Sequence, residues 1–360
     1  MNWFKKTILD KNFWFGNSGE KFKSSPNLSV TVVIPAYNEE NFISETIESI
    51  LNQTHKCEIV VVNDSSTDRT FEVSSQYPVT VITTKTNQGS KSQALNYARD
   101  YVNTDIMICV DADTILKENS VENLIKAFSD EDVMVASGFV VSHTPTSIWS
   151  AGRYSEYLIG QSIYKSAQRN SHAVLVASGC FFGVRTEFYK SVGFKNRSMA
   201  EDMDMTWEAI ERGYDIAFIE DAICMVHDPN DVKTYCKQVE RWYRGFFQCV
   251  EVRKYNLFKS IKLGIVAYMY MFINLFGAPF YLYFIFLDPI LSMFIISMTI
   301  WFFILYGWWS VYKYGGDYIS IPWSVCSMML LSLVNYGIYI KSAFLELILK
   351  RQLSTWIKGH

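Results

Sequence analysis

The chain has 360 residues, of which 49% are hydrophobic, 16% are aromatic and only 19% are charged, so a disordered tail and a collagen-like repeat are excluded. The 33 Lys and Arg residues against 36 Asp and Glu leave a formal net charge of -3, and no basic stripe indicates a nucleic-acid partner. The seven cysteines contain no Cys-x-x-Cys pair, which disfavours a disulfide framework and a zinc knuckle. We expect a folded protein with reduced thiols.

The N-terminal residues carry aromatic and basic clusters but no continuous apolar run. Trp3-Phe4-Lys5-Lys6 and Phe13-Trp14-Phe15 are typical of contacts at a lipid surface rather than of a signal peptide. We therefore expect residues 1–28 to form an interfacial segment. The chain up to about residue 260 is then expected to stay on one side of the membrane.

From Ser29 onward, short β-branched runs alternate with helical stretches. The predicted strands are 30–34, 59–62, 79–82 and 106–110, and the predicted helices begin near Glu39 and near Ser66 and cover 92–101. This alternation predicts an α/β fold, and strands that are apolar on both faces indicate a largely parallel sheet covered by helices. Such sheets bind ligands at the carboxyl ends of their strands, so the polar residues after each run are the candidates for a site.

Three of these strand ends bring an aromatic ring and several carboxylates to one edge. They carry the sequences 35–40 (PAYNEE), 63–68 (NDSSTD) and 111–113 (DAD). Each alone is also typical of a helix cap or a turn. Together they predict a pocket in which Tyr37 stacks on a base and Asp64 accepts a hydrogen bond from a ring N–H. Asp111 and Asp113 would hold a divalent cation through hard oxygen ligands, and that cation would neutralise a diphosphate.

These motifs, in this order, resemble the donor site of family 2 glycosyltransferases with the GT-A fold. The resemblance continues in residues 87–96 (NQGSKSQALN), in Ser178-Gly179 followed by Arg185, which is similar to the acceptor-side segment, and in Glu201-Asp202, whose aspartate resembles the family's base. It implies a Rossmann-like nucleotide-sugar-binding domain over residues 29–230 and a Mg²⁺ or Mn²⁺ cofactor on Asp113 and Asp111. The donor-nucleotide residues that it implies are Pro35, Tyr37, Glu39, Asp64, Lys91 and Asp111.

A further motif, Gln238-Val239-Glu240-Arg241-Trp242, puts Gln, Arg and Trp on one face of a helix. Alone, this pattern is equally typical of a helix at the membrane surface with Arg and Trp as anchors. After the motifs upstream, it resembles the Gln-x-x-Arg-Trp signature of the cellulose, chitin and hyaluronan synthase branch. The resemblance implies that Gln238 and Arg241 hold the diphosphate and that Trp242 stacks under the acceptor sugar. We expect interfacial amphipathic helices over residues 231–262.

The last hundred residues are strongly apolar. From Leu263 to Tyr312 the only charged side chain is Asp288, beside Pro289, which predicts two membrane spans joined by a hairpin. A third uncharged run covers Tyr318 to Ile340. We therefore expect about three transmembrane helices over residues 263–345 and a C-terminal tail over 346–360.

Basic residues suggest how the chain lies in the membrane. Lys254, Lys259 and Lys262 precede the first span, and the positive-inside tendency places such residues in the cytosol. The expectation is a multi-pass protein of the cell membrane whose catalytic domain faces the cytosol. The tail carries Lys350, Arg351 and Lys358, which would also prefer the cytosol, so the side of the C-terminus stays open.

The resemblance implies an inverting sugar transfer in which Asp202, beside Glu201, removes the acceptor proton. A lipid-linked glycan acceptor is favoured by the small number of spans, whereas the Gln-x-x-Arg-Trp motif favours a processive polysaccharide synthase. A transporter or scaffold that senses nucleotides is a third possibility, but transporters keep ionisable residues at mid-bilayer, and here only Asp288 is available. UDP and GDP donors both stay open, as does the sugar.

Overall fold

The computed structural model describes residues 27–170, 174–257 and 261–350. Nearly all of the predicted N-terminal interfacial segment, Lys259 and residues 351–360 lie outside the described residues. Contacts divide the chain into two compact units, one of residues 1–140 and 165–226 and one of residues 141–164 and 227–360. Residues 141–164, which the predicted boundary at 230 places with the sheet, thus group with the C-terminal helices.

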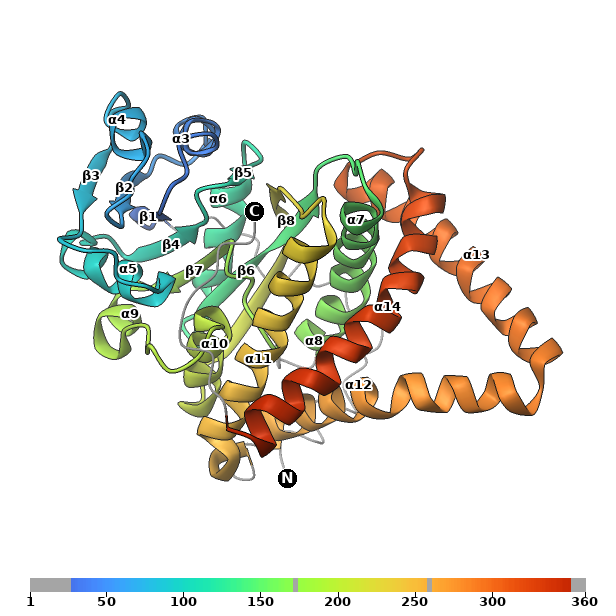
Figure 1. The fold of residues 1–360 in the computed structure, drawn as a ribbon. Coiled ribbons are helices and arrows are strands. Elements are labelled where there is room, and N and C mark those ends of the chain that lie inside the picture. Colours follow the sequence, from blue (N-terminus) through green and yellow to red (C-terminus); the bar gives the residue numbers. More distant parts are fainter. Residues whose placement is uncertain (1–26, 171–173, 258–260, 351–360) are drawn as a thin grey trace. The chain divides into compact units, whose positions relative to one another are not determined.

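An eight-stranded sheet is the core of the first unit, with the strand order β3-β2-β1-β4-β7-β6-β8-β5 (Figure 1). The strands are β1 (Val30–Ala36), β2 (Glu58–Asn63), β3 (Thr80–Thr83), β4 (Ile106–Val110), β5 (Thr114–Leu116), β6 (Val133–Ser142), β7 (Phe181–Arg185) and β8 (Asp215–Val226). β1 to β4 pair in parallel, whereas β7 is antiparallel to β4 and β6, and β5 is antiparallel to β8. The sheet is therefore mixed, and the predicted parallel arrangement holds for β1 to β4 only.

Helices flank this sheet in the first unit. They are α3 (Ile43–Leu51), α4 (Thr70–Ser74), α5 (Lys91–Tyr97), α6 (Ser120–Ile125), α8 (Ser166–Asn170), α9 (Thr186–Val192) and α10 (Glu201–Glu211), with 3-10 turns η2 (Ala98–Tyr101) and η3 (Lys126–Ser129). The first two begin about four residues later than predicted. The backbone N–H groups of Glu39 and Glu40 donate to the side chains of Thr70 and Asp68 at 2.7 and 3.1 Å, so residues 38–40 belong to a turn instead of a helix.

The second unit is helical. It contains α7 (Ile148–Gly160), α11 (Val232–Leu257), α12 (Ile261–Leu287), α13 (Pro289–Tyr314) and α14 (Ile321–Ala343), with the π-helical turn η5 (Phe344–Ile348); a second such turn, η4 (Gln161–Lys165), ends in the first unit. Three helices, Leu263–Leu287, Pro289–Tyr314 and Ile321–Ile348, are long and apolar enough to cross a membrane. The predicted turn lies between α12 and α13, where Asp288 caps α13 by accepting from the Leu291 N–H at 3.0 Å and Pro289 opens the helix.

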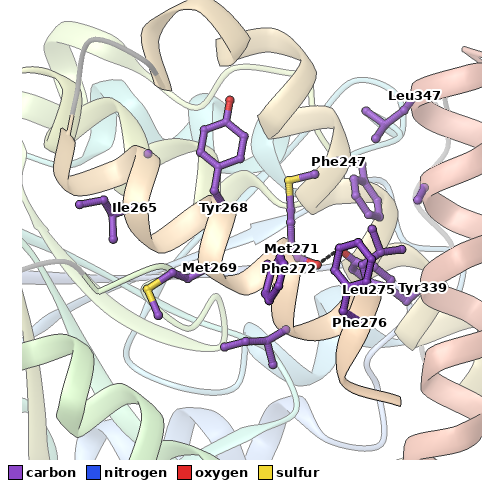
Figure 2. A pocket seen from close by; sticks show the side chains of 13 residues that line it. Phe247, Ile265, Tyr268, Met269, Met271, Phe272, Leu275, Phe276, Tyr339 and Leu347 are labelled. Atoms are coloured by element: carbon purple, nitrogen blue, oxygen red, sulfur yellow. Dashed lines mark hydrogen bonds between the residues drawn. The ribbon is translucent and has the colours of Figure 1, made fainter. Parts of the chain in front are cut away.

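Within this unit α11 is one continuous helix, and the buried Tyr235 and Val239 pack against Leu331 of α14. α7 also packs on α14, where a side chain at Gly152 would collide with Leu331. An apolar pocket of about 840 Å³ is lined by residues of α11, α12, α14 and η5 (Figure 2). Its lining includes Phe247, Tyr268, Met271, Phe272, Tyr339 and Leu347. The C-terminal helices therefore have an apolar exterior and also an apolar hollow.

Candidate active site

The turns after β1 and β2 are fastened to each other. The Asn38 N–H donates to Ser66 Oγ at 3.1 Å, and the Thr67 N–H donates to Asn38 Oδ1 at 2.8 Å. Asn38 and Ser65 have positive φ values of 57° and 54°, a conformation that non-glycine residues adopt at a cost and that clusters at functional sites. This pairing holds the half-buried Tyr37 and the buried Glu39 beside the end of β2.

Pro35 lies within β1, opposite Val62 of β2, so it shapes the strand end and donates no hydrogen bond of its own. Asp64 is 5% exposed, and its carboxylate accepts from the Gln88 N–H at 3.0 Å and from Thr84 Oγ1 at 2.8 Å. These bonds tie the end of β2 to the segment before α5. The Asp64 carboxylate thus has protein donors already, and a base N–H would add to them.

Lys91 joins three separate segments of the first unit. Its Nζ lies 2.5 Å from Asp111 Oδ1, 3.4 Å from Glu201 Oε1 and 2.9 Å from the Gly179 carbonyl oxygen. Burial lowers the pKa of Lys91, but the negative charges around it, that of Asp111 first, raise the pKa well above its ordinary value. Lys91 is therefore a fixed positive charge, placed by the Ser90 cap at the first residue of α5.

Gly179 and Asp202 are in close contact. A Cβ atom built on Gly179 would lie 2.8 Å from Asp202 Oδ2, so any side chain at position 179 would displace that carboxylate. Asp202 and Glu201 open α10, where the helix dipole favours negative charge, and Asp202 Oδ1 accepts from the Met203 N–H at 2.7 Å. The structure thus assembles Lys91, Asp111, Gly179 and the Glu201-Asp202 pair into one cluster.

Asp111 and Asp113 follow β4 directly, at the same sheet edge as the ends of β1 and β2. Among the residues that the structure describes, no group of three or more His, Cys, Asp or Glu side chains is arranged to hold a metal ion. Mg²⁺ and similar ions often bind through one or two carboxylates together with substrate phosphates. The Asp-Ala-Asp pair fits that kind of site, in which a ligand supplies the other oxygens.

Gln238, Arg241 and Trp242 lie on α11 in the second unit. There Gln238 and Trp242 contact Arg153 of α7, which is 1% exposed and which sequence reasoning missed. The Arg153 guanidinium lies 4.5 Å from the centre of the Trp242 ring and donates to Gln238 Oε1 at 3.4 Å. Arg153 also pairs with Glu156 at 2.7 Å. One face of the Trp242 ring is thus covered by a cation.

Lys165 carried no motif in the sequence, whereas Arg185 belonged to the predicted acceptor-side segment. Lys165 donates to Ser178 Oγ at 2.6 Å and to Ser137 Oγ at 3.1 Å, so it fixes the predicted Ser178 side chain. Arg185, by contrast, donates to the carbonyl oxygens of Val133, Phe128 and Asp130. These hydrogen bonds tie the end of β7 to η3 and to the start of β6. A lysine or arginine inside an apolar stretch was the only available sequence signal for Lys165 and Arg153.

Comparisons with known proteins agree with this arrangement. The family described as glycosyltransferase like family 2 matches residues 26–245, more than half of the chain. "Probable glycosyltransferase YdaM" of Bacillus subtilis is 28% identical over 239 residues, which cover 63% of this chain and 56% of that protein. "Poly-beta-1,6-N-acetyl-D-glucosamine synthase" of Staphylococcus aureus is 26% identical over 261 residues, which cover 68% of this chain and 63% of that protein. The chain spans less than two thirds of the length of these relatives.

The fold is similar to that of a solved structure. "Mannosyltransferase PcManGT from Pyrobaculum calidifontis in complex with GDP-Man and Mn2+" superposes with a TM-score of 0.56 at 17% identity, covering 92% of this chain and 96% of that one. At this identity the likeness concerns the fold alone. It confirms the predicted class, a GT-A-like α/β domain followed by apolar C-terminal helices.

Proposed function

The chain belongs to glycosyltransferase family 2, and from this premise we propose that it is a membrane-bound inverting enzyme that transfers a sugar from a UDP- or GDP-sugar to a lipid-linked glycan. The observation that carries the proposal is the cluster around Lys91, which binds Asp111 at 2.5 Å and Glu201 at 3.4 Å. Lys91 is a buried cation between the end of β4 and the start of α10. From there it can bind the diphosphate of a donor, while a base at the start of α10 acts on the other side of the sugar. A nucleotide-sensing transporter or scaffold is no longer a competing hypothesis.

On the donor side, Tyr37 would stack on the base and Asp64 would accept from its ring N–H. Pro35 and Glu39 would shape the walls of this pocket, since Pro35 is in β1 and Glu39 is fastened to Thr70. Lys91 would exchange part of its contact with Asp111 for a phosphate oxygen, because a carboxylate and a phosphate are both anionic acceptors for an ammonium group. The positive charge would then stabilise the leaving diphosphate.

On the acceptor side, Asp202 would remove the proton from the attacking hydroxyl, a role typically worth about 10² to 10⁴ in rate. Glu201 would keep Lys91 in place through their ion pair. Ser178 and Gly179 would border the acceptor, since Gly179 leaves the Asp202 carboxylate unobstructed. Attack opposite the leaving group inverts the anomeric centre, so an α-linked donor would give a β-linked product.

Asp113, with Asp111, would hold a Mg²⁺ or Mn²⁺ ion. Such an ion supplies Lewis-acid stabilisation of the negative charge on the diphosphate. The related fold of the mannosyltransferase solved with GDP-Man and Mn²⁺ supports this assignment.

We propose that Gln238 and Arg241 hold the diphosphate and that Trp242 stacks on the acceptor sugar with the ring face that Arg153 leaves uncovered. Trp242→Ala is expected to raise the acceptor KM about tenfold, equivalent to ~1.4 kcal/mol of binding, with the donor KM unchanged. Kinetics with the lipid extract that supports turnover would measure this. Trp149→Ala is the matched control, because Trp149 packs on Tyr235 in the same cluster outside the motif. An unchanged acceptor KM would make Trp242 a membrane anchor.

Features of the second unit support a lipid-linked acceptor. α11 carries the Gln-x-x-Arg-Trp motif and, through Phe247, one wall of the 840 Å³ apolar pocket, which is suited to the hydrocarbon chain of a lipid-linked glycan (Figure 2). The three apolar helices and Lys254 support a multi-pass protein of the cell membrane with its catalytic domain in the cytosol. The second candidate is a processive polysaccharide synthase, favoured by the Staphylococcus aureus relative.

Donor consumption tests the proposal. Detergent-purified protein in Mn²⁺ is given a panel of UDP- and GDP-sugars with or without membrane lipids, and the release of free nucleotide is measured. We expect one donor to be consumed only when lipids are present. Consumption without lipid and accumulation of a high-mass polymer would favour the synthase. No consumption of any donor, with lipid or without, would count against both.

A further inference from the structure

Lys165 is a buried lysine that the catalytic proposal does not use. It is 8% exposed and ends the π-helical turn η4. Its Nζ donates to Ser178 Oγ at 2.6 Å and Ser137 Oγ at 3.1 Å and lies 5.2 Å from the centre of the Phe218 ring. In the described part of the chain, no carboxylate lies within ion-pair distance of this ammonium. Burying an ammonium without such a partner is costly, which points to a role beyond packing.

The contacts of Lys165 lead directly to the proposed base. Ser137 Oγ accepts from the Ser178 N–H at 3.0 Å, so Lys165 and Ser137 together hold both the backbone and the side chain of Ser178. Gly179 is the next residue, and a Cβ atom there would lie 2.8 Å from Asp202 Oδ2. A displacement of Ser178 would therefore move the backbone against which the Asp202 carboxylate rests.

We propose that Lys165 is a positioning residue of the active site, whose ammonium holds the Ser178-Gly179 segment against Asp202 and favours the ionised form of that carboxylate. This inference rests on the proposed function, because it takes Asp202 as the base. In this role Lys165 does not touch the sugar. It acts on Asp202 through its hydrogen bond to Ser178 and through its positive charge.

The surroundings of Lys165 set its protonation. Burial lowers the pKa of Lys165 to about 8, while Cys180 before β7, Asp202 of α10 and Cys224 of β8 face it and raise the pKa in part. The ammonium is consequently charged at neutral pH and loses its proton as the pH rises through about 8. If the charge assists Asp202, the transfer rate has to fall over the same interval.

Two variants separate hydrogen bonding from charge. Lys165→Gln keeps a donor for the serine hydroxyls without the charge, and Lys165→Met removes both. In the donor-consumption assay we expect Lys165→Gln to lose about tenfold in kcat at pH 7 and Lys165→Met to lose more, each with a nearly unchanged donor KM. The fall in rate near pH 8 should be present in the wild type and absent from both variants. Lys126→Gln is the matched control, because Lys126 donates a local hydrogen bond to Asn123 Oδ1 at 2.8 Å and lies outside the site.

A second readout does not depend on activity. Because the pKa of Lys165 is lowered in the folded protein, the unfolded chain binds more protons between about pH 8 and the ordinary lysine pKa of 10.5. Wild-type stability should therefore rise relative to Lys165→Gln over this interval, measured as a shift in the difference of Tm.

These readouts distinguish the two proposals. A Tm shift without donor consumption by the wild type would count against the proposed function and, with it, against the catalytic part of the role. A variant rate that falls at every pH but keeps the wild-type profile would make Lys165 merely structural and overturn the inference. Wild-type kcat in Lys165→Gln would overturn it too.

Discussion

Asp202→Asn should abolish sugar transfer while leaving donor binding intact. The loss should reach at least about 10² to 10⁴ in rate, the usual contribution of a general base. Asparagine has the same shape, and its Oδ1 can still accept from the Met203 N–H, which Asp202 now does at 2.7 Å. The start of α10 is therefore preserved and only the basic oxygen is lost. Nucleotide release and equilibrium binding of the nucleotide measure the two effects separately.

The matched control is Asp204→Asn in the same turn of α10. Asp204 is buried and binds Arg197 through two side-chain nitrogen atoms at 3.1 to 3.2 Å, so this variant loses an ion pair of the helix without touching the proposed base. We expect it to lower the Tm and to keep most of the transfer rate. If Asp202→Asn keeps more than about a tenth of the rate, Asp202 is not the base.

The strands could be predicted because the preference of β-branched residues for extended backbone is a local property of the sequence. The β-branched runs became β1 to β4, and parallel pairing brings the residues after β1, β2 and β4 to one edge. The later strands β6, β7 and β8 pair with partners distant in sequence, and they made the sheet mixed. The parallel arrangement was predicted from local apolarity, which contains no information on such partners.

The cluster around Lys91 shows the same division. Its residue types followed from motifs, but its central contact, Lys91 with Asp111, joins residues 20 apart, and Gly179 and Glu201 come from still farther along the chain. The late start of α3 has a similar cause, since side chains after β2 accept hydrogen bonds from the backbone after β1. Long-range hydrogen bonds of this kind leave no periodic pattern in a single sequence.

The roles of Lys165 and Arg153 could not be predicted from the sequence. Each lies in or beside residues 141–164, which contain no family motif, and each is recognised only by the partners that surround it. A buried charge is informative in a structure because burial costs free energy that something must offset. In the sequence the same residues are marked only by their position inside an apolar stretch.

Asp113→Ala should lose metal-dependent donor binding. Asp111 forms an ion pair with Lys91 at 2.5 Å, which partly neutralises its charge. Asp113 is therefore the carboxylate of this pair that is better suited to bind a metal ion. Removing Asp113 would leave a metal ion with few hard oxygen ligands from the protein. We expect the nucleotide affinity in Mn²⁺ to fall about tenfold or more, to the level measured with a chelator, because the affinity gained from the metal is lost.

Calorimetric titration of UDP and GDP, each with Mn²⁺ and with a chelator, measures this difference. Asp105→Ala serves as the control, because Asp105 precedes β4 while Asp113 follows it, and it accepts hydrogen bonds from Ser29 at 2.7 and 2.8 Å. That variant loses a carboxylate at the opposite end of the same strand and should keep its metal-dependent affinity. An Asp113→Ala protein that binds nucleotide in Mn²⁺ as tightly as the wild type would remove Asp113 from the metal site and leave Lys91 as the principal charge on the diphosphate.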